Sequence, residues 1–300
     1  MKRFLKKTLL ILIAVFIPFF VLCFFVDGTT DPFYMRFTSP PQKNLIIGTS
    51  RAAQGLQPRV FDSVLGIDMY NYSFTIMDSP FGKVYLESIK RKHNKNKNGN
   101  FVVTVDPWAI SSWSNNPNDL KQFRENDRLL AKTKYVNLNP NFEYIIDNLG
   151  GNFKDIFIPP SDNLFLHSNG WLEVKDIDMD SLTVNKRISR KIDLYKNTHL
   201  PKTKLSQTRV DYLLKTIKYF KKYGQVYLVR LPVHPQMMNV ENKLLPNFDE
   251  VITDAISESD DYLDLTSYNE KFSYTDGNHL YKSSGKEVSL IIANWINREN

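Results

Sequence analysis

The sequence predicts an α/β fold in which about five parallel strands form a doubly wound, flavodoxin-like sheet behind an N-terminal transmembrane helix. Short apolar runs rich in β-branched residues alternate with longer segments whose apolar residues recur at helical spacing. This alternation is typical of a parallel sheet with helices on both faces. A long uncharged stretch precedes the alternating pattern and predicts the membrane helix.

The composition indicates a folded protein, and 300 residues suit one large domain or two small ones. Hydrophobic residues make up 42% of the 300 residues, which is enough to form a substantial core. The net charge is +7, but four of the 39 basic residues lie before residue 8. The remaining 35 nearly balance the 32 acidic residues. We therefore expect no nucleic-acid partner.

The N-terminal segment 1–26 is predicted to be a signal anchor. Thr8–Val26 contains nineteen residues without a charge and spans about 28 Å as a helix, close to the thickness of a bilayer core. Bulky Phe24 and Phe25 stand where a cleavage site would need small residues. Four basic residues precede the run and predict a cytoplasmic N-terminus: Lys2, Arg3, Lys6 and Lys7. The domain after Asp27 is then expected outside the cytoplasm, although a cleaved signal peptide is an alternative.

The single cysteine, Cys23, lies inside this apolar run. An intrachain disulfide and a cysteine-based zinc site are therefore excluded. Residues 27–43 contain several prolines and small polar residues, which predict a linker between the membrane and a domain over 44–300.

The chain is organised around Asn44–Arg51. Three apolar residues, two of them β-branched, predict a strand buried on both faces, and Gly48 ends it. Helix-favouring residues follow Ser50. Ser50 is thus predicted in the turn between the carboxyl end of a strand and the start of a helix, where ligands of open α/β sheets bind.

The remaining sequence repeats this pattern and closes with a helix. Its expected strands cover 67–73, 101–105, 226–231 and 262–265, and its expected helices cover 80–93, 207–223, 248–257 and a segment capped by Ser283 or Ser284. Residues 109–204 lack the alternation. We expect them to form an insertion at the sheet edge that carries Ser50.

Polar residues follow the expected strands at this same edge. Asn71 and Ser73 end the second strand, and Asp106 follows the third. Together with Arg51 they are candidates for oxyanion stabilisation or substrate binding. His234 follows the fourth strand and is a further candidate, either as a substrate contact or as a rival base.

Asp276 and His279 complete a catalytic hypothesis for Ser50. A serine hydroxyl needs a base within hydrogen-bond reach and a third group that orients this base. His279 is the expected base and Asp276, three residues earlier on a turn, the expected orienting group. The residue two after the serine is Ala52, so the G-x-S-x-G elbow of α/β-hydrolases is absent.

Two motifs resemble those of SGNH (GDSL-type) hydrolases. Gly48-Thr49-Ser50 follows the first strand, as G-D-S does there, and Asp276-Gly277-Asn278-His279 matches the D-x-x-H before the final helix. The resemblance implies a Ser50, His279, Asp276 triad, no metal and no organic cofactor. Thr49 replaces the usual aspartate, and the G-x-N-D block that helps to form the oxyanion hole is not visible.

The residues of these motifs resemble more specifically those of one membrane-anchored branch of the SGNH family. Gly-Thr-Ser-Arg at 48–51, Asp-Pro-Trp at 106–108 and the terminal Asp-Gly-x-His-Leu are similar to proteins of polysaccharide O-acetylation or teichoic-acid D-alanylation. The resemblance implies acyl transfer to a carbohydrate or lipid acceptor of the cell envelope. It also implies a membrane-embedded acyl-export partner.

Two alternatives remain open from the sequence. The chain could be a catalytically inactive module that binds or assembles an envelope machinery, with Ser50 acting only as a helix N-cap. A flavodoxin-type phosphate binder is disfavoured, because Gly48 is the only glycine in the first loop.

Overall fold

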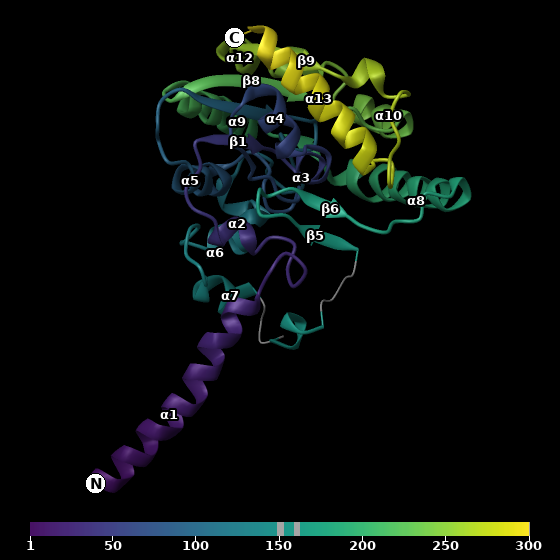
Figure 1. The fold of residues 1–300 in the computed structure, drawn as a ribbon. Coiled ribbons are helices and arrows are strands. Elements are labelled where there is room, and N and C mark those ends of the chain that lie inside the picture. Colours follow the sequence, from purple (N-terminus) through teal and green to yellow (C-terminus); the bar gives the residue numbers. More distant parts are fainter. Residues whose placement is uncertain (149–152, 159–162, 300) are drawn as a thin grey trace.

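The computed structural model describes residues 1–148, 153–158 and 163–299. Its central feature is a parallel five-stranded sheet with the strand order β2-β1-β3-β8-β9 and helices on both faces (Figure 1). This confirms the predicted fold class. The strands are β1 (Asn44–Ile47), β2 (Met69–Asn71), β3 (Gly99–Thr104), β8 (Gly224–Arg230) and β9 (Asp261–Asp264).

The interior strands β1 and β3 are buried on both faces, as their uninterrupted apolar runs predict. Leu45 and Ile47 of β1 pack into one apolar cluster, whereas Ile46 points to the other. The same alternation holds in β3, where Phe101 and Val102 enter opposite clusters. Because successive side chains of a strand point to opposite faces of the sheet, one apolar run contributes residues to both apolar clusters.

Each face of the sheet is covered by its own group of helices. On one face, α3 (Ser50–Gly55), α4 (Pro58–Leu65) and α13 (Lys282–Glu299) cover an apolar cluster that includes Phe61 and Ile292. On the other face lie α5 (Lys83–Lys92), α9 (Gln207–Lys221), α11 (Phe248–Val251) and α12 (Thr253–Glu258). Because all five strands are parallel, their carboxyl ends meet at one edge of the sheet.

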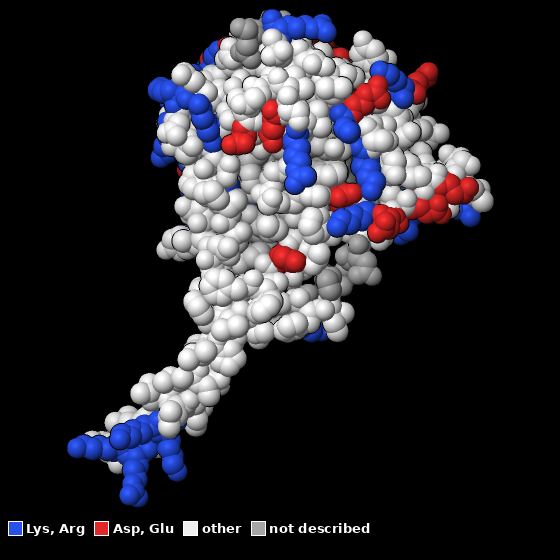
Figure 2. Space-filling model, in the orientation of Figure 1, with Lys and Arg blue, Asp and Glu red and all other residues white. Residues whose placement is uncertain are grey.

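The N-terminal helix α1 (Lys2–Leu22) extends away from the domain (Figure 1). Lys2–Phe25 is long and apolar enough to cross a membrane, a test that a signal sequence would also pass. Lys and Arg gather at its far end, followed by an uncharged stem (Figure 2). Where the stem meets the domain, the ring of Phe20 stacks at 5.5 Å on Phe142 of α7 (Phe142–Asn148).

Residues 27–43 differ from the expected linker, because they pack into the domain. Tyr34 and Phe37 are buried, and Arg36 of α2 (Met35–Thr38) is fully enclosed. The Arg36 guanidinium donates to the carbonyls of Asn71 (3.1 Å) and Gly170 (2.6 Å). The aromatic residues of this segment bury apolar surface against the domain. The free energy gained by this burial outweighs the preference of prolines and small polar residues for an unpacked linker.

The described part of 109–204 contributes no strand to the central sheet, and its assignment as an insertion stays a prediction. It forms two small antiparallel strand pairs and several helices. These are β4 (Ser111–Ser112, paired with β7, Lys204–Leu205), α6 (Leu129–Lys132), α7, β5 (Leu164–Leu166), β6 (Leu172–Val174) and α8 (Ser181–Leu194). Helix α8 continues into a π-helical turn over Tyr195–His199.

Three boundaries differ from the expected ones. The helix expected over 248–257 is interrupted at Ile252, which separates α11 from α12. The last helix begins at Lys282, so Ser284 lies inside it, and its hydroxyl accepts from the backbone N–H of Ser273 (2.9 Å). Helix α10 (Pro235–Leu244) was not expected, although Pro235 is a typical first residue of a helix.

Candidate active site

Ser50 lies at the carboxyl edge of the sheet, in the position that the sequence predicts. Strand β1 ends at Ile47, and α3 begins at Ser50. Gly48 between them is required by close packing, because a Cβ there would lie 1.8 Å from the Thr104 hydroxyl oxygen. The carbonyl of Gly48 accepts from the Ser79 hydroxyl at 2.7 Å, which fixes the loop.

The loop that carries Asp276 and His279 is a tight turn around Gly277. Gly277 has φ of +80°, a left-handed conformation that favours glycine. The Asp276 carboxylate accepts from the backbone N–H groups of Asn278 (3.0 Å) and His279 (3.1 Å). This Asx-type turn brings two side chains three residues apart onto the same side of the loop.

The three side chains of the catalytic hypothesis form one hydrogen-bonded series. Nδ1 of His279 lies 2.9 and 3.1 Å from the two carboxylate oxygens of Asp276, and Nε2 lies 2.8 Å from Oγ of Ser50. An ionised carboxylate can only accept, so Nδ1 carries the hydrogen. Nε2 is then the acceptor that faces the Ser50 hydroxyl. The structure brings these residues together, while their catalytic role stays a prediction.

Lys191 of α8 adds a positive charge behind this series. Its ammonium lies 2.9 Å from the second oxygen of Asp276. Burial alone would raise the pKa of Asp276, but His279 and Lys191 outweigh it and hold the pKa well below its usual range. Asp276 is therefore ionised at neutral pH. No pattern in the sequence singles out Lys191, because it belongs to the irregular insertion.

A buried ion pair lies on the other side of Ser50. Arg51, 5% exposed, pairs with Glu241 of α10. The indole N–H of Trp108 donates to the same Glu241 oxygen at 2.9 Å. Burial lowers the pKa of Arg51, but Glu241 and Asp106 outweigh it and raise the pKa above its ordinary value. The guanidinium is thus permanently charged and rigidly held.

The same guanidinium holds Asn278. Nε of Arg51 lies 3.0 Å from the Asn278 side-chain oxygen, and Nη2 lies 2.6 Å from it. Asn278 is 5% exposed, and its amide nitrogen lies 3.4 Å from Nε2 of His279. Sequence reasoning missed this residue as a site component, although it stands inside the motif that singled out its two neighbours.

Asp106 lies at the site and shapes the loop after β3. One carboxylate oxygen accepts from the backbone N–H groups of Trp108 (2.9 Å) and Ala109 (3.0 Å). The other oxygen faces the Thr49 hydroxyl at 3.4 Å and Arg51 at 3.9 Å. Asp106 therefore fixes the wall beside Ser50, next to the threonine that departs from the G-D-S motif.

Asn71 and Ser73 do not lie where an oxyanion hole would need them. The amide nitrogen of Asn71 donates to the carbonyls of Ala52 (2.8 Å) and Leu56 (2.9 Å), and its oxygen accepts from the backbone of Ser73 (3.2 Å). Ser73 is fully buried, and its hydroxyl contacts the carbonyl of Ile46 at 3.4 Å. Both side chains tie β2 to its neighbours, so this expectation needs correction.

His234 also has a role within the fold. Its Nδ1 accepts from the backbone N–H of Gln236 and caps α10, and its ring edge faces Tyr274 at 5.7 Å. Its own backbone N–H donates to the carbonyl of Gly277 at 3.2 Å. Among the described contacts His234 does not reach Ser50. It supports the loop that carries His279 and is not placed as a rival base.

A cavity of about 10 Å³ lies beside Ser50. This volume admits roughly one water molecule. Its far wall is Tyr195 from the π-helical turn, whose ring packs edge-on at 4.8 Å against Trp108. The cavity is lined by Thr49, Ser50, Arg51, Ile76, Asp106, Trp108, Tyr195 and Asn278.

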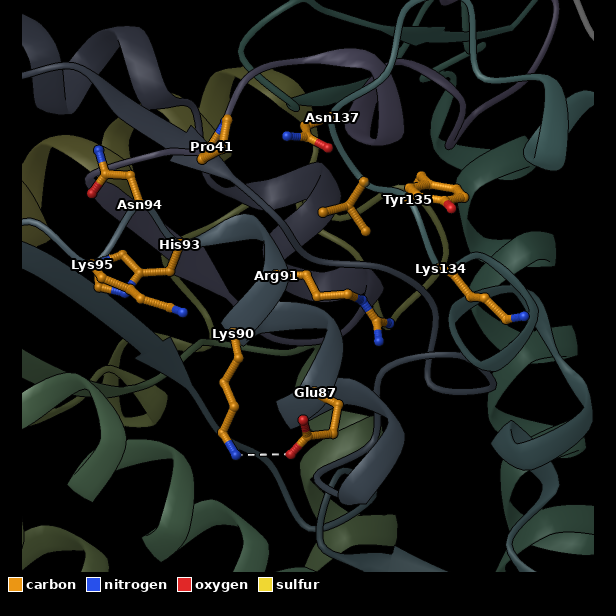
Figure 3. A pocket seen from close by; sticks show the side chains of 11 residues that line it. Pro41, Glu87, Lys90, Arg91, His93, Asn94, Lys95, Lys134, Tyr135 and Asn137 are labelled. Carbon is orange, nitrogen blue, oxygen red and sulfur yellow. Dashed lines mark hydrogen bonds and ion pairs between the residues drawn. The ribbon is translucent and has the colours of Figure 1, made fainter.

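A much larger pocket of about 670 Å³ lies at the opposite, amino-terminal edge of the sheet (Figure 3). It is lined by basic side chains such as Lys90, Arg91 and Lys134, and Lys90 pairs with Glu87 at 2.8 Å. Its lining contains no serine or cysteine. The smaller cavity is therefore the candidate active site, because it holds a nucleophile with an oriented base.

Within the described residues, no group of three or more His, Cys, Asp or Glu side chains is arranged to hold a metal ion. The expectation of a reaction without metal or organic cofactor stays a prediction.

No protein-family model matches this sequence, and no curated protein does. Two solved structures are similar in fold: an inhibitor-bound aryl esterase of M. Smegmatis and a carbohydrate acetylesterase family member from Sinorhizobium meliloti. Each is 10% identical with a TM-score of 0.37, and each match covers 86% of this chain and 100% or 99% of the other. Similarity at this level carries no residue role across, so the case for the site rests on the geometry of this chain.

Proposed function

We propose that this protein is a serine esterase or O-acyltransferase in which Ser50 is the nucleophile, His279 the general base and Asp276 the orienting carboxylate. The observation that carries the proposal is the 2.8 Å contact between Ser50 Oγ and His279 Nε2, with Asp276 on the opposite ring nitrogen. A hydroxyl, an imidazole and a partly buried carboxylate in this order are the components of serine acyl transfer.

The reaction runs in two halves. His279 Nε2 takes the hydroxyl proton while Ser50 Oγ attacks the ester carbonyl carbon, and the C=O electron pair moves onto oxygen. The tetrahedral intermediate collapses, the C–O bond to the leaving alcohol breaks, and His279 returns the proton to that alcohol. Water or an acceptor hydroxyl then attacks the Ser50 ester by the same steps, giving hydrolysis or transfer.

Asp276 supports both halves by stabilising the imidazolium that forms when His279 is protonated. Lys191 keeps this carboxylate ionised and in place through its 2.9 Å contact. The charged pair therefore acts on the orientation of the ring, and Asp276 itself stays deprotonated throughout.

We place the domain at the outer face of a membrane, tethered by α1. The basic cluster and uncharged stem of Figure 2 support this topology, since basic residues mark the cytoplasmic side of a span. A carbohydrate or lipid hydroxyl of the cell envelope is the proposed acceptor. A membrane-embedded acyl-export protein is the proposed partner, because acyl groups crossing the membrane would arrive beside the tether.

A fluorophosphonate probe tests the nucleophile directly, because it reacts with activated serines. Full-length protein in detergent should be labelled, and Ser50→Ala should abolish the labelling. Ser63→Ala, which changes an exposed helix serine, is the matched control and should label as the wild type does. Equal labelling of Ser50→Ala and wild type would contradict the proposal.

A second candidate is a catalytically inactive binding or assembly module. The small cavity and the inward-facing Asn71 and Ser73 favour it, since they leave the expected oxyanion donors unavailable. Cells that carry Ser50→Ala in place of the wild-type chain distinguish the two. Unchanged O-acyl content of envelope glycans would favour the module, and a loss with normal protein levels would favour the enzyme.

A further inference from the structure

We propose that the Asn278 side chain donates the hydrogen bond that stabilises the oxyanion during Ser50 chemistry, and that Arg51 positions it. The inference rests on the proposed function and deepens it. It assigns to Asn278 the role expected of Asn71 or Ser73, whose polar atoms are bonded elsewhere in the fold.

The orientation of the Asn278 amide follows from its neighbours. Arg51 approaches the amide with two nitrogens, at 3.0 and 2.6 Å. A guanidinium has only donors, so the group that faces it must be the amide oxygen. The NH₂ group therefore points away from Arg51. Glu241 and Trp108 hold the guanidinium in turn, and all these contacts are buried, so the amide has no freedom to flip.

The NH₂ group points towards the reacting atoms. It lies 3.4 Å from Nε2 of His279, the same nitrogen that accepts the Ser50 hydroxyl at 2.8 Å. This nitrogen is already occupied by Ser50, so an amide hydrogen remains for another acceptor. Asn278 and Ser50 both line the 10 Å³ cavity, which has room for one small oxygen-bearing group.

The buried position of Asn278 strengthens the hydrogen bond that its amide can donate. Asn278 is 5% exposed, and hydrogen bonds to a developing charge are worth more where water is excluded. The donor is an uncharged amide, and the charge of the neighbouring Arg51 is paired with Glu241. It therefore stabilises the negative oxygen of the tetrahedral intermediate without holding an anionic product. When the intermediate collapses, the electron pair returns to the C=O bond and the amide hydrogen stays on Asn278.

Two substitutions of Asn278 test the assignment on hydrolysis of a small acetate ester. Asn278→Ala removes the donor. Asn278→Asp has nearly the same shape and can still accept from Arg51, but it has no N–H to donate. We expect kcat per active site to fall about 10²- to 10³-fold in both, with KM changed less than about threefold.

Affinity for a phenylboronic acid supplies a second readout, because the boronate forms a tetrahedral adduct with Ser50 Oγ. It should weaken in parallel with kcat, which a purely structural role of Asn278 would not produce. Asn269→Ala is the matched control: Asn269 is also buried (7% exposed), and its side chain accepts from the backbone of Val233. We expect this control to lower the melting temperature while kcat per active site is retained.

The outcomes separate the two proposals. If wild-type protein neither hydrolyses esters nor reacts with a fluorophosphonate, the enzymatic function itself fails. If wild type is active but folded Asn278→Ala and Asn278→Asp keep kcat within threefold, Asn278 is not the oxyanion donor. The same conclusion follows if Asn269→Ala loses kcat as strongly as Asn278→Ala does.

Discussion

The two edges of the central sheet use polar residues in opposite ways. At the carboxyl edge, charged and polar groups surround a cavity of about 10 Å³, and each contacts an oriented partner. At the amino edge, a pocket of about 670 Å³ is lined by several basic side chains (Figure 3), and Arg91, Lys95 and Lys134 among them are exposed. The comparison shows that convergence of oriented groups, and not volume, marks the candidate active site.

The edges differ because of strand direction. In a parallel sheet the loops after β1, β3 and β9 all leave at the carboxyl edge, so Ser50, Asp106 and the Gly277 turn meet there. The amino edge receives the carboxyl end of α5. There Lys92 is fully buried, and its ammonium donates to two oxygens of Ser39 (2.6 and 2.7 Å) and to the carbonyl of Val136 (2.9 Å).

The largest expected effect is that of Asp276→Asn on ester hydrolysis. The asparagine amide can donate to Nδ1 of His279, which forces the hydrogen onto Nε2 and removes the base from Ser50. We expect kcat to fall on the order of 10⁴-fold. Glu87→Gln at the amino edge is the control and should retain the wild-type rate. A rate within tenfold of wild type for Asp276→Asn would contradict the triad.

The second prediction concerns Lys92 and stability. Burial lowers its pKa to about 7, so between pH 7 and about 10 the unfolded chain binds a proton that the folded chain does not. The free energy of unfolding should therefore rise with pH in this window, by about 4 kcal/mol at most. Urea unfolding in detergent at several pH values measures the slope.

Lys92→Met is the variant that isolates this contribution. Its unfolding free energy should lose most of the rise between pH 7 and about 10, while ester hydrolysis per folded molecule is unchanged. The same slope in both proteins would show that the three oxygen acceptors keep Lys92 charged when folded. The amino edge would then stabilise its buried charge as the carboxyl edge does.

A smaller effect is expected for Lys191→Ala. Its side chain is 28% exposed, so its pair with Asp276 is partly screened by solvent. We expect kcat to fall about three- to tenfold because Asp276 holds the imidazole less firmly. Lys186→Ala, an exposed lysine on the same helix, should retain the wild-type rate. Equal rates for Lys191→Ala and wild type would show that Lys191 does not support the reaction of Ser50, His279 and Asp276.

The smallest effect is expected at the basic pocket. The double variant Lys90→Ala, Lys134→Ala should change ester hydrolysis less than twofold and the free energy of unfolding by less than about 0.5 kcal/mol, since both side chains lie at the surface. A tenfold loss of hydrolysis would show that the amino edge takes part in substrate binding, and the distinction between the edges would have to be given up.

Local patterns were sufficient for the framework of the fold. The apolar run before Gly48 predicts a strand buried on both faces, and the helical spacing before Gly224 predicts α9, and both are confirmed. The predictions failed where packing overrides composition. Residues 27–43 look like a linker because of their prolines, yet Tyr34 and Phe37 are buried in the domain.

Local sequence patterns are enough to place a serine and an Asp-x-x-His turn after strands of one parallel sheet, and the common direction of the strands sends both to the same edge. The residues that contact this serine and this turn follow only from the packing of the folded chain. Arg51 meets Glu241 and Asn278 across 190 and 227 residues, and Lys191 reaches Asp276 from an insertion without regular pattern. Such contacts depend on how helices pack over the sheet, and no local periodicity encodes that packing.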